Sequence, residues 1–278
     1  MSVPRRDPEL IVAGHCMQLE RFVRRGGPWR PIEFGSAVAI LPHPGGGVAL
    51  FDTGYAPRFH AATARLPYRL YSALLPVSCA EPDAAVSQLA ARGMAADEVK
   101  LVVLSHLHGD HVAGLRDFPR ARVVLGDGAL APGWRTASAW RNTAHGFVPA
   151  LLPDDVEQRL MPLAELPVAG TGLGGWLRNG HDLFGDGTAF VLPLPGHAEG
   201  HLGLWLPGWG ADGVLLAGDA VWHERAITHG ELPLPFLRGR RPAYEQVVAE
   251  LARLHRERPD LAIVPSHCNA SLSRIRRG

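Results

Sequence analysis

The chain has 278 residues, of which 46% are hydrophobic and 20% are charged, a composition typical of soluble globular proteins. A formal net charge of +1 gives no electrostatic footprint for nucleic acid or for an anionic membrane surface, so neither partner is expected. No apolar run approaches the ~18 residues of a membrane span, and no signal-peptide pattern is present. Cys16, Cys79 and Cys268 are odd in number and far apart, which indicates no disulfide framework and favours a cytoplasmic protein.

The first predicted elements are two short strands within residues 36–54, joined by a glycine turn at residues 45–47. Asp52 follows the second strand, and two interpretations of it stay open. It is either a turn-forming residue or a carboxylate that supports a metal-binding histidine. Residues 55–80 show no clean period and are expected to form a covering segment that is helical in part. A helix is predicted over residues 82–92, because its apolar residues share one face.

A buried strand is predicted over residues 99–104, because this run is short, apolar and rich in β-branched residues. The next seven residues, 105–111, read Ser-His-Leu-His-Gly-Asp-His and are unsuited to continuing the strand. Imidazole and carboxylate are ligands that suit zinc and related first-row metals. A structural zinc finger would need cysteines at paired spacing, which this sequence lacks. The segment therefore predicts a metal-binding loop, followed by a helix that starts within residues 112–115 and points its N-terminus at the site.

A further strand is predicted over residues 121–125, after which the pattern dissolves among glycines, prolines and tryptophans. We interpret residues 126–186 as a loop-rich cap inserted into a single domain that spans residues 1–278, with a plain surface excursion as the alternative. Regular patterns then return, and they predict three strands, a helix and a last strand over residues 188–195, 202–206, 213–217, 241–258 and 261–264.

Four of the predicted strands end close to a candidate metal ligand, and the loops at one edge of a sheet can bring such side chains together. Seven side chains exceed the four or so ligands of a single zinc ion, and they suit two ions. Asp219 is the carboxylate expected to bridge the two ions. The seven candidate ligands are His106, His108, Asp110, His111, His197, Asp219 and His267.

Taken together, these motifs resemble the metallo-β-lactamase superfamily. The resemblance covers about residues 36–270, and its five motifs in combination are specific. They are Asp-Thr-Gly at residues 52–54, Ser-His-Leu-His-Gly-Asp-His at 105–111, Pro-Gly-His at 195–197, Gly-Asp at 218–219 and Ser-His at 266–267.

The resemblance implies an α/β (α+β) fold, a four-layer αββα sandwich, with a dinuclear metal site at one edge. Two ions a few ångströms apart would share a water, lower its pKa toward ~7 and present hydroxide as the nucleophile. In that chemistry Asp110 would also pass a proton to the leaving group. By position, the resemblance implies one metal held by His106, His108 and His197, a second held by Asp110, His111 and His267, and Asp219 between them.

Other side chains near these motifs are expected to orient the ligands rather than bind metal. They are Asp52, Ser105 and His201, and for His201 a polar residue satisfied within a strand is the alternative. Cys268 adjoins a ligand and is interpreted as packing rather than catalytic. Four loop histidines are expected to face solvent or to line the pocket, and their roles stay open: His145, His181, His223 and His229.

Within the superfamily, the long spacer between His111 and His197, the Pro-Gly-His-x-x-Gly-His element and the chain length are most similar to the lactonase and organophosphate-hydrolase-like branch. N-acyl homoserine lactonases typically place a tyrosine just after the bridging aspartate. Here Ala220, Val221 and Trp222 stand in that stretch, which leaves the substrate open. A broad apolar pocket for an acyl or aryl group is expected, lined by Trp222, Phe236, Trp134 and Trp140.

The implied activity is metal-dependent hydrolysis of a hydrophobic lactone or carboxylic ester, either acyl homoserine lactone-like or an aryl ester. The expected cofactors are two divalent ions, zinc first, with manganese or iron as alternatives. A thioesterase or phosphotriesterase of the same superfamily stays open. So does a mononuclear iron oxidoreductase similar to persulfide dioxygenases, and so does a non-catalytic binding module. A small-molecule substrate is the expected partner, and a homodimer is left open.

Overall fold

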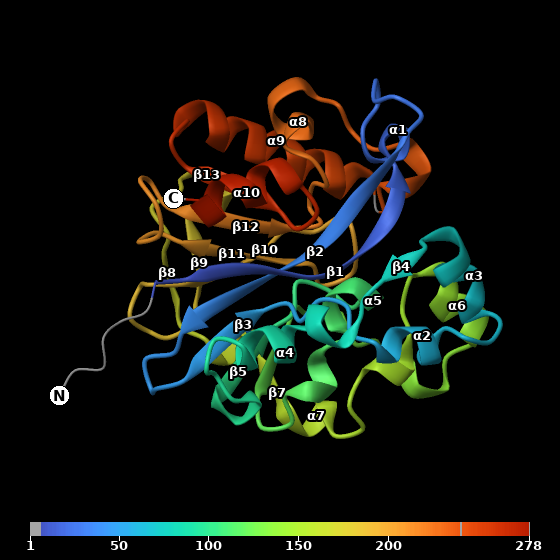
Figure 1. Ribbon diagram of the computed structural model, residues 1–278. Coiled ribbons are helices and arrows are strands. Elements are labelled where there is room, and N and C mark those ends of the chain that lie inside the picture. The colour runs from blue at the N-terminus through green and yellow to red at the C-terminus, as the bar shows by residue number, and fades with distance from the viewer. Residues whose placement is uncertain (1–6, 240, 278) are drawn as a thin grey trace.

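The computed structural model describes residues 7–239 and 241–277 and contains two β-sheets packed face to face (Figure 1). The first sheet has the strand order β4-β1-β2-β3-β5-β6-β7. In it β3, β5, β6 and β7 run parallel to one another, whereas β2 pairs antiparallel with β1 and β3, and β1 pairs antiparallel with β4. Its strands are β1 (Glu9–Leu19), β2 (Pro31–Pro42), β3 (Val48–Phe51), β4 (Val77–Ser78), β5 (Val99–Val103), β6 (Arg122–Leu125) and β7 (Leu160–Pro162).

The second sheet has the strand order β13-β12-β11-β10-β9-β8, and only the β12–β13 pair is parallel. Its strands are β8 (Val168–Gly170), β9 (Asn179–Asp182), β10 (Phe190–Pro193), β11 (Leu202–Leu206), β12 (Val214–Gly218) and β13 (Ala262–Pro265). The α-helices are α1 (Glu20–Val23), α2 (Arg58–Ala62), α3 (Tyr68–Leu74), α4 (Ala85–Ala90), α5 (Gly109–Val112), α6 (Ala139–Ala144), α7 (Val156–Arg159), α8 (Glu224–His229), α9 (Arg241–Glu257) and α10 (Asn269–Arg277). Among the described residues, no helix combines the length and apolar character needed to cross a bilayer.

Buried apolar residues fill three spaces, which separate four layers. One cluster lies between the two sheets, a second between the first sheet and helices that include α2 and α4, and a third between the second sheet and α8 and α9 (Figure 1). Strands β11 and β12 are buried along their whole length, because one face meets the other sheet and the opposite face meets helices. The predicted αββα sandwich is confirmed.

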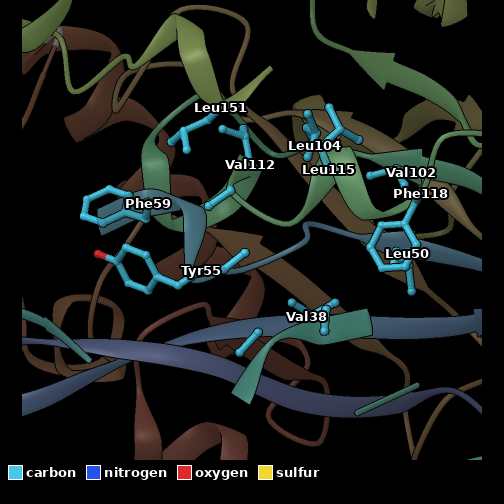
Figure 2. Packing of buried hydrophobic residues seen from close by; sticks show 14 of the residues in the cluster. Val38, Leu50, Tyr55, Phe59, Val102, Leu104, Val112, Leu115, Phe118 and Leu151 are labelled. Carbon is cyan, nitrogen blue, oxygen red and sulfur yellow. The ribbon is translucent and has the colours of Figure 1, made fainter. Parts of the chain in front are cut away.

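The cluster beneath the first sheet also supports the predicted metal-binding loop (Figure 2). Leu50 of β3 and Val102 of β5 contribute side chains from the sheet, and Phe59 of α2 packs edge to face on Tyr55 with 5.1 Å between ring centroids. The Phe59 ring lies so close to Gly109 that a Cβ at Gly109 would meet it at 2.6 Å. Truncating a fully buried phenylalanine such as Phe59 costs about 3–5 kcal/mol. This packing therefore fixes the start of α5 against the core.

Most elements after residue 36 lie where the sequence predicts them, but α5 and β1 differ from the prediction. The helix expected to begin within residues 112–115 begins earlier, as α5 at Gly109, so Asp110 and His111 are helical residues. Strand β1 was not predicted, because its register shifts between Val12 and His15 and breaks the alternation that marks a strand.

Residues 126–186, for which a loop-rich cap is predicted, supply part of both sheets. Strand β7 extends the edge of the first sheet, and β8 and β9 extend the edge of the second. Short helices α6 and α7 lie between these strands. Strands of three or four residues carry too little periodic pattern to be recognised from the sequence. The interpretation of the chain as one domain with a cap stays a prediction.

Candidate metal centre

The seven candidate ligands lie at one edge of the sandwich because four strands end there. His106 follows β5 of the first sheet, whereas His197, Asp219 and His267 follow β10, β12 and β13 of the second. The backbone N–H of Leu202 donates to the carbonyl oxygen of Ser105 at 2.8 Å and so connects the two sheets beside the site. Sequence-distant loops are therefore held together at one point, as the strand ends predict.

The seven side chains form two groups that share one residue. In each group one ligand atom from every member lies within 4.8 Å of the others. The first group is partly open, since His108 and His197 are half-buried, whereas every member of the second group is buried. The groups are His106, His108, His197 and Asp219, and Asp110, His111, His267 and Asp219.

Asp219 belongs to both groups because its two carboxylate oxygens face different neighbours. Oδ1 lies 3.0 Å from Nε2 of His267 and 3.4 Å from Nε2 of His111. Oδ2 lies 3.4 Å from Nε2 of His197 and accepts a hydrogen bond of 2.9 Å from the indole N–H of Trp222. The carboxylate therefore stands between the two groups, the position expected of a bridging ligand.

Three of the ligand histidines turn Nε2 toward the other ligands, and their Nδ1 atoms contact supporting groups on the opposite side of the ring. Nδ1 of His111 lies 2.7 Å from Oδ2 of Asp52, Nδ1 of His106 lies 2.9 Å from Oγ of Ser105, and Nδ1 of His267 donates to the carbonyl oxygen of Gly35 at 2.6 Å. Their Nε2 atoms are buried and make no hydrogen bond of good geometry among the described residues, although those of His111 and His267 face carboxylate oxygens at 3.0–3.4 Å. Buried polar atoms without a partner are costly, so a cation between the rings fits these donors.

Charge in the second group also fits a cation. Burial alone would raise the pKa of Asp219, yet His267 and His111 hold that pKa well below its usual value. Burial opposes the charged form of His267 as well, but Asp219 and Asp110 raise its pKa to about 9. The negative charge of Asp110 and Asp219 thus favours a positive charge in a space closed to solvent. A divalent ion would supply that charge with the histidines neutral.

In the first group burial outweighs the nearby carboxylate, and it lowers the pKa of His106 and of His197 well below the usual value. Neutral imidazole is the form that binds metals. Nε2 of His197 and Nδ1 of His108 face one another at 3.1 Å. The first group therefore offers three neutral nitrogens and one carboxylate oxygen, a donor set that suits zinc.

Asp52 contacts the predicted metal-binding loop, as the second of its two interpretations requires. Its Oδ1 accepts the backbone N–H of Ser105 at 2.7 Å, and its Oδ2 accepts the Ser105 hydroxyl at 2.9 Å and contacts His111. Asp52 adopts the left-handed φ of 62°, and its own N–H donates to the carbonyl oxygen of Val103 at 2.8 Å. This backbone costs about 1–3 kcal/mol for a residue other than glycine, a cost that the three contacts offset.

His201 also contacts the site from behind: its Nε2 accepts the backbone N–H of Asp219 at 3.0 Å. Burial lowers the pKa of His201 to about 4, which keeps the ring neutral and able to accept. The site further depends on two features without a sequence signal. They are the Gly35 carbonyl behind His267 and the turn at Gly146, where a Cβ would lie 2.8 Å from Cδ2 of His108.

The sequence matches a known protein family over a range that includes all seven candidate ligands. A family model described as the metallo-beta-lactamase superfamily matches residues 31–267, most of the chain. The chain belongs to the metallo-β-lactamase superfamily.

Of two curated relatives, one is named a probable metallo-hydrolase and the other an N-acyl homoserine lactonase. A probable metallo-hydrolase of Mycobacterium tuberculosis is 28% identical over 255 residues, which cover 84% of this chain and 76% of that protein. The N-acyl homoserine lactonase AttM of Rhizobium radiobacter is 28% identical over 156 residues, 51% of each chain. The present chain is thus similar in sequence to hydrolases of this superfamily.

A solved structure of an N-acyl homoserine lactone hydrolase, with the product N-hexanoyl-L-homoserine at its catalytic metal centre, has the same fold. It superposes with a TM-score of 0.72 and covers 98% of this chain and 97% of its own. At 17% sequence identity, the likeness concerns the fold. It confirms the metallo-β-lactamase architecture.

A cavity of about 380 Å³ adjoins the two ligand groups, within the size range of small-molecule sites. It reaches His267 and Trp222 at its inner side. Its lining is less apolar than the sequence predicts, because the segment before β2 contributes Glu20 and Arg30. The hydrophobic character expected for the whole pocket is therefore limited to part of this cavity.

Of the four predicted pocket residues, Trp222 lines this cavity. Trp134 is a core residue whose indole N–H donates to Oε1 of Glu157 at 2.7 Å. Trp140 on α6 faces solvent with 62% of its surface exposed. The side chain of Phe236 lies outside the described residues. The sequence does not show which tryptophans after residue 126 lie near the ligand groups. This is why Trp134 and Trp140 were predicted to line the pocket.

The remaining candidates differ in their surroundings. His223 lines the cavity, and its Nδ1 accepts the backbone N–H of Arg225 at the start of α8 at 3.1 Å. His181 lies in β9 rather than in a loop. Cys268 is buried and lines the cavity, and among the described residues all three cysteines are free.

Proposed function

We propose that the protein is a dinuclear metal-dependent hydrolase of a lactone or carboxylic ester. One observation carries the proposal: Asp219 presents one oxygen to each of two ligand groups. A mononuclear site would need only the first or the second group. Membership of a superfamily whose curated relatives are named metallo-hydrolases supports the reaction class.

In this proposal His106, His108 and His197 hold one ion and Asp219 joins it to the second. The other members of the second group, Asp110, His111 and His267, hold that second ion. Two divalent ions, for which we propose zinc, would supply an activated water and polarise the scissile carbonyl.

The chain itself orients these groups and moves the proton. Asp52, Ser105 and His201 fix the ligands from behind, and Trp222 holds Oδ2 of Asp219. We assign proton transfer to the leaving oxygen to Asp110, because this carboxylate belongs to one group only and is not occupied as a bridge.

The lactone or ester substrate is proposed on similarity and on the cavity. The relative AttM is named an N-acyl homoserine lactonase. The cavity beside the site has an apolar inner wall that includes Phe34 and Trp222, suited to an acyl or aryl group.

The first experiment is metal analysis of protein purified without added metal, with turnover assays on lactones, aryl esters, thioesters and phosphotriesters. We expect about two zinc, manganese or iron ions per chain, and lactone or ester turnover that chelation abolishes and zinc restores. One iron per chain with oxygen consumption on thiol substrates would replace the proposal with an oxidoreductase. Metal without any turnover would favour a binding module.

A further inference from the structure

We propose that the cavity binds an acyl chain ending in an anionic group, a carboxylate, and that Arg30 binds this group. This inference rests on the proposed function for the position of the scissile bond, and it adds the substrate class. It arises from the order of exposure along the cavity wall and from the ion pairs that hold Arg30.

The cavity changes from apolar and buried to charged and exposed. Beside the metal centre, the ring of Phe34 stacks on His267 with 3.9 Å between centroids and meets Trp222 edge to face at 5.7 Å. Val23 is also buried on this wall. At the outer part stands Arg30, whose side chain is 68% exposed. A substrate with its ester at the ligand groups therefore directs its chain past apolar rings toward a guanidinium.

Arg30 is held in place rather than free to move with solvent. Its Nε donates to Oε2 of Glu20 at 2.7 Å, and its carbonyl oxygen accepts the backbone N–H of Glu20 at 2.9 Å. Glu20 is itself only 5% exposed. A guanidinium bonded through Nε keeps its two Nη groups for a further partner, and the planar pair matches a carboxylate.

Arg30 shares its carboxylate partner, Glu20, with a second arginine. Glu20 also binds Arg24, which binds Glu231, and Glu231 binds Arg225. These ion pairs join three arginines to two glutamates. Because Glu20 is shared between Arg24 and Arg30, it does not neutralise Arg30 fully. The same contacts, with the bond from the N–H of Arg25 to the carbonyl oxygen of Leu232 at 2.9 Å, tie the loop before β2 to the segment after α8 (Figure 1).

Four other titratable residues line the cavity: His267 of the second ligand group, Cys268 beside it, His223 and Glu33. Burial lowers the pKa of His223, so its ring adds no positive charge at neutral pH. Glu33 is an exposed carboxylate on β2 and opposes an anion. Arg30 and Glu33 should therefore have opposite effects. Removing the charge of Arg30 should weaken binding of an anionic chain end, whereas removing the charge of Glu33 should strengthen it.

The test uses metal-loaded protein and two readouts. The first is kcat/KM for p-nitrophenyl half-esters of straight-chain dicarboxylic acids, each paired with the ester of the monocarboxylic acid of equal chain length. The second, which needs no turnover, is calorimetric binding of the corresponding dicarboxylates and monocarboxylates. Arg30→Gln is compared with Glu33→Gln and with the control Arg25→Gln, an exposed arginine of the same loop outside the cavity.

We expect a preference for the carboxylate-ended compounds at one chain length in both readouts. Arg30→Gln should lower that preference about tenfold, the loss expected for one charge-assisted contact, and Glu33→Gln should raise it, while Arg25→Gln leaves it unchanged. Equal treatment of the paired compounds, or an equal loss for both in Arg30→Gln, overturns the inference. Arg30-dependent binding without hydrolysis of any ester supports the inference and refutes the proposed function instead.

Discussion

The ligand groups and the cavity beside them are built on opposite principles. The ligand side chains leave short loops at strand ends, and their rear atoms are bonded to Asp52, Ser105 and the Gly35 carbonyl. The outer cavity wall comes from the loop before β2, where Arg30 is exposed and held by ion pairs. A rigid centre thus adjoins a wall that can vary without disturbing it, so reaction and substrate can be changed separately.

The largest effect should come from breaking the bridge. Asp219→Asn removes the charge shared by both groups, so we expect kcat/KM to fall about 10³-fold or more, about 4 kcal/mol of activation free energy. Metal content should fall as well, measured by elemental analysis after dialysis. Full metal content with nearly normal turnover would refute the role of Asp219 as a bridge.

A smaller effect should follow from weakening the support behind the ligands. Asp52→Asn retains a residue that tolerates the left-handed backbone but removes the charge that faces His111. Metal affinity should fall about 10- to 100-fold, measured by competition with a chelator. Asp260→Asn, at an exposed position, is the control and should not change it. An unchanged affinity in Asp52→Asn would leave Asp52 as a turn residue only.

The turn at Gly146 lies directly against the ring of His108. Gly146→Ala places a methyl group against His108 in a backbone with φ of 64°, so both strain and a displaced ring follow. Gly46→Ala has a similar φ of 85° but nothing within 4 Å, and measures the strain alone. Both should lose about 1–2 kcal/mol in urea unfolding, whereas only Gly146→Ala should also weaken metal binding. Equal metal affinity in the two variants would contradict the contact with His108.

The smallest effect should come from the tie that holds the cavity wall. Hydrogen bonds from Arg225 and Arg24 lower the pKa of Glu231 from 4.5 to about 2. The folded pKa lies below the ordinary value, so this stabilisation is present above 4.5 and is lost as the pH falls toward 2. Glu231→Gln should therefore melt slightly lower than the native chain at neutral pH, with a difference that closes in acid. A difference that persists below pH 2 would have another origin.

The clustering of the seven candidate ligands could be predicted from the sequence because its signal is local. His106 to His111 are adjacent, and His197, Asp219 and His267 each follow an apolar run that marks a strand end. The supports behind the ligands were only partly predictable. Asp52 and His201 stand in motifs, whereas a backbone carbonyl such as that of Gly35 has no residue type to reveal it.

The cavity could not be predicted, for a physical reason. Its wall joins the segment before β2 to residues after β12 and β13, and no sequence pattern records which side chains of distant loops face each other. Tryptophan content alone suggested an apolar pocket, yet Trp134 is used in the core and Trp140 faces solvent. Arg30 stands in no motif, and its ion pair with Glu20 is visible only in the structure.

The backbone hydrogen bond between Leu202 and Ser105 connects the two sheets, and each ligand group contains residues that follow strands of both sheets. Each group takes two residues from the half of the chain that builds β5 and α5 and two from the half that builds β10 to β13, with Asp219 counted in both. A fragment that ends before His197 completes neither group, and neither does the remaining fragment. Metal binding would therefore report reassembly if the two halves were produced as separate polypeptides.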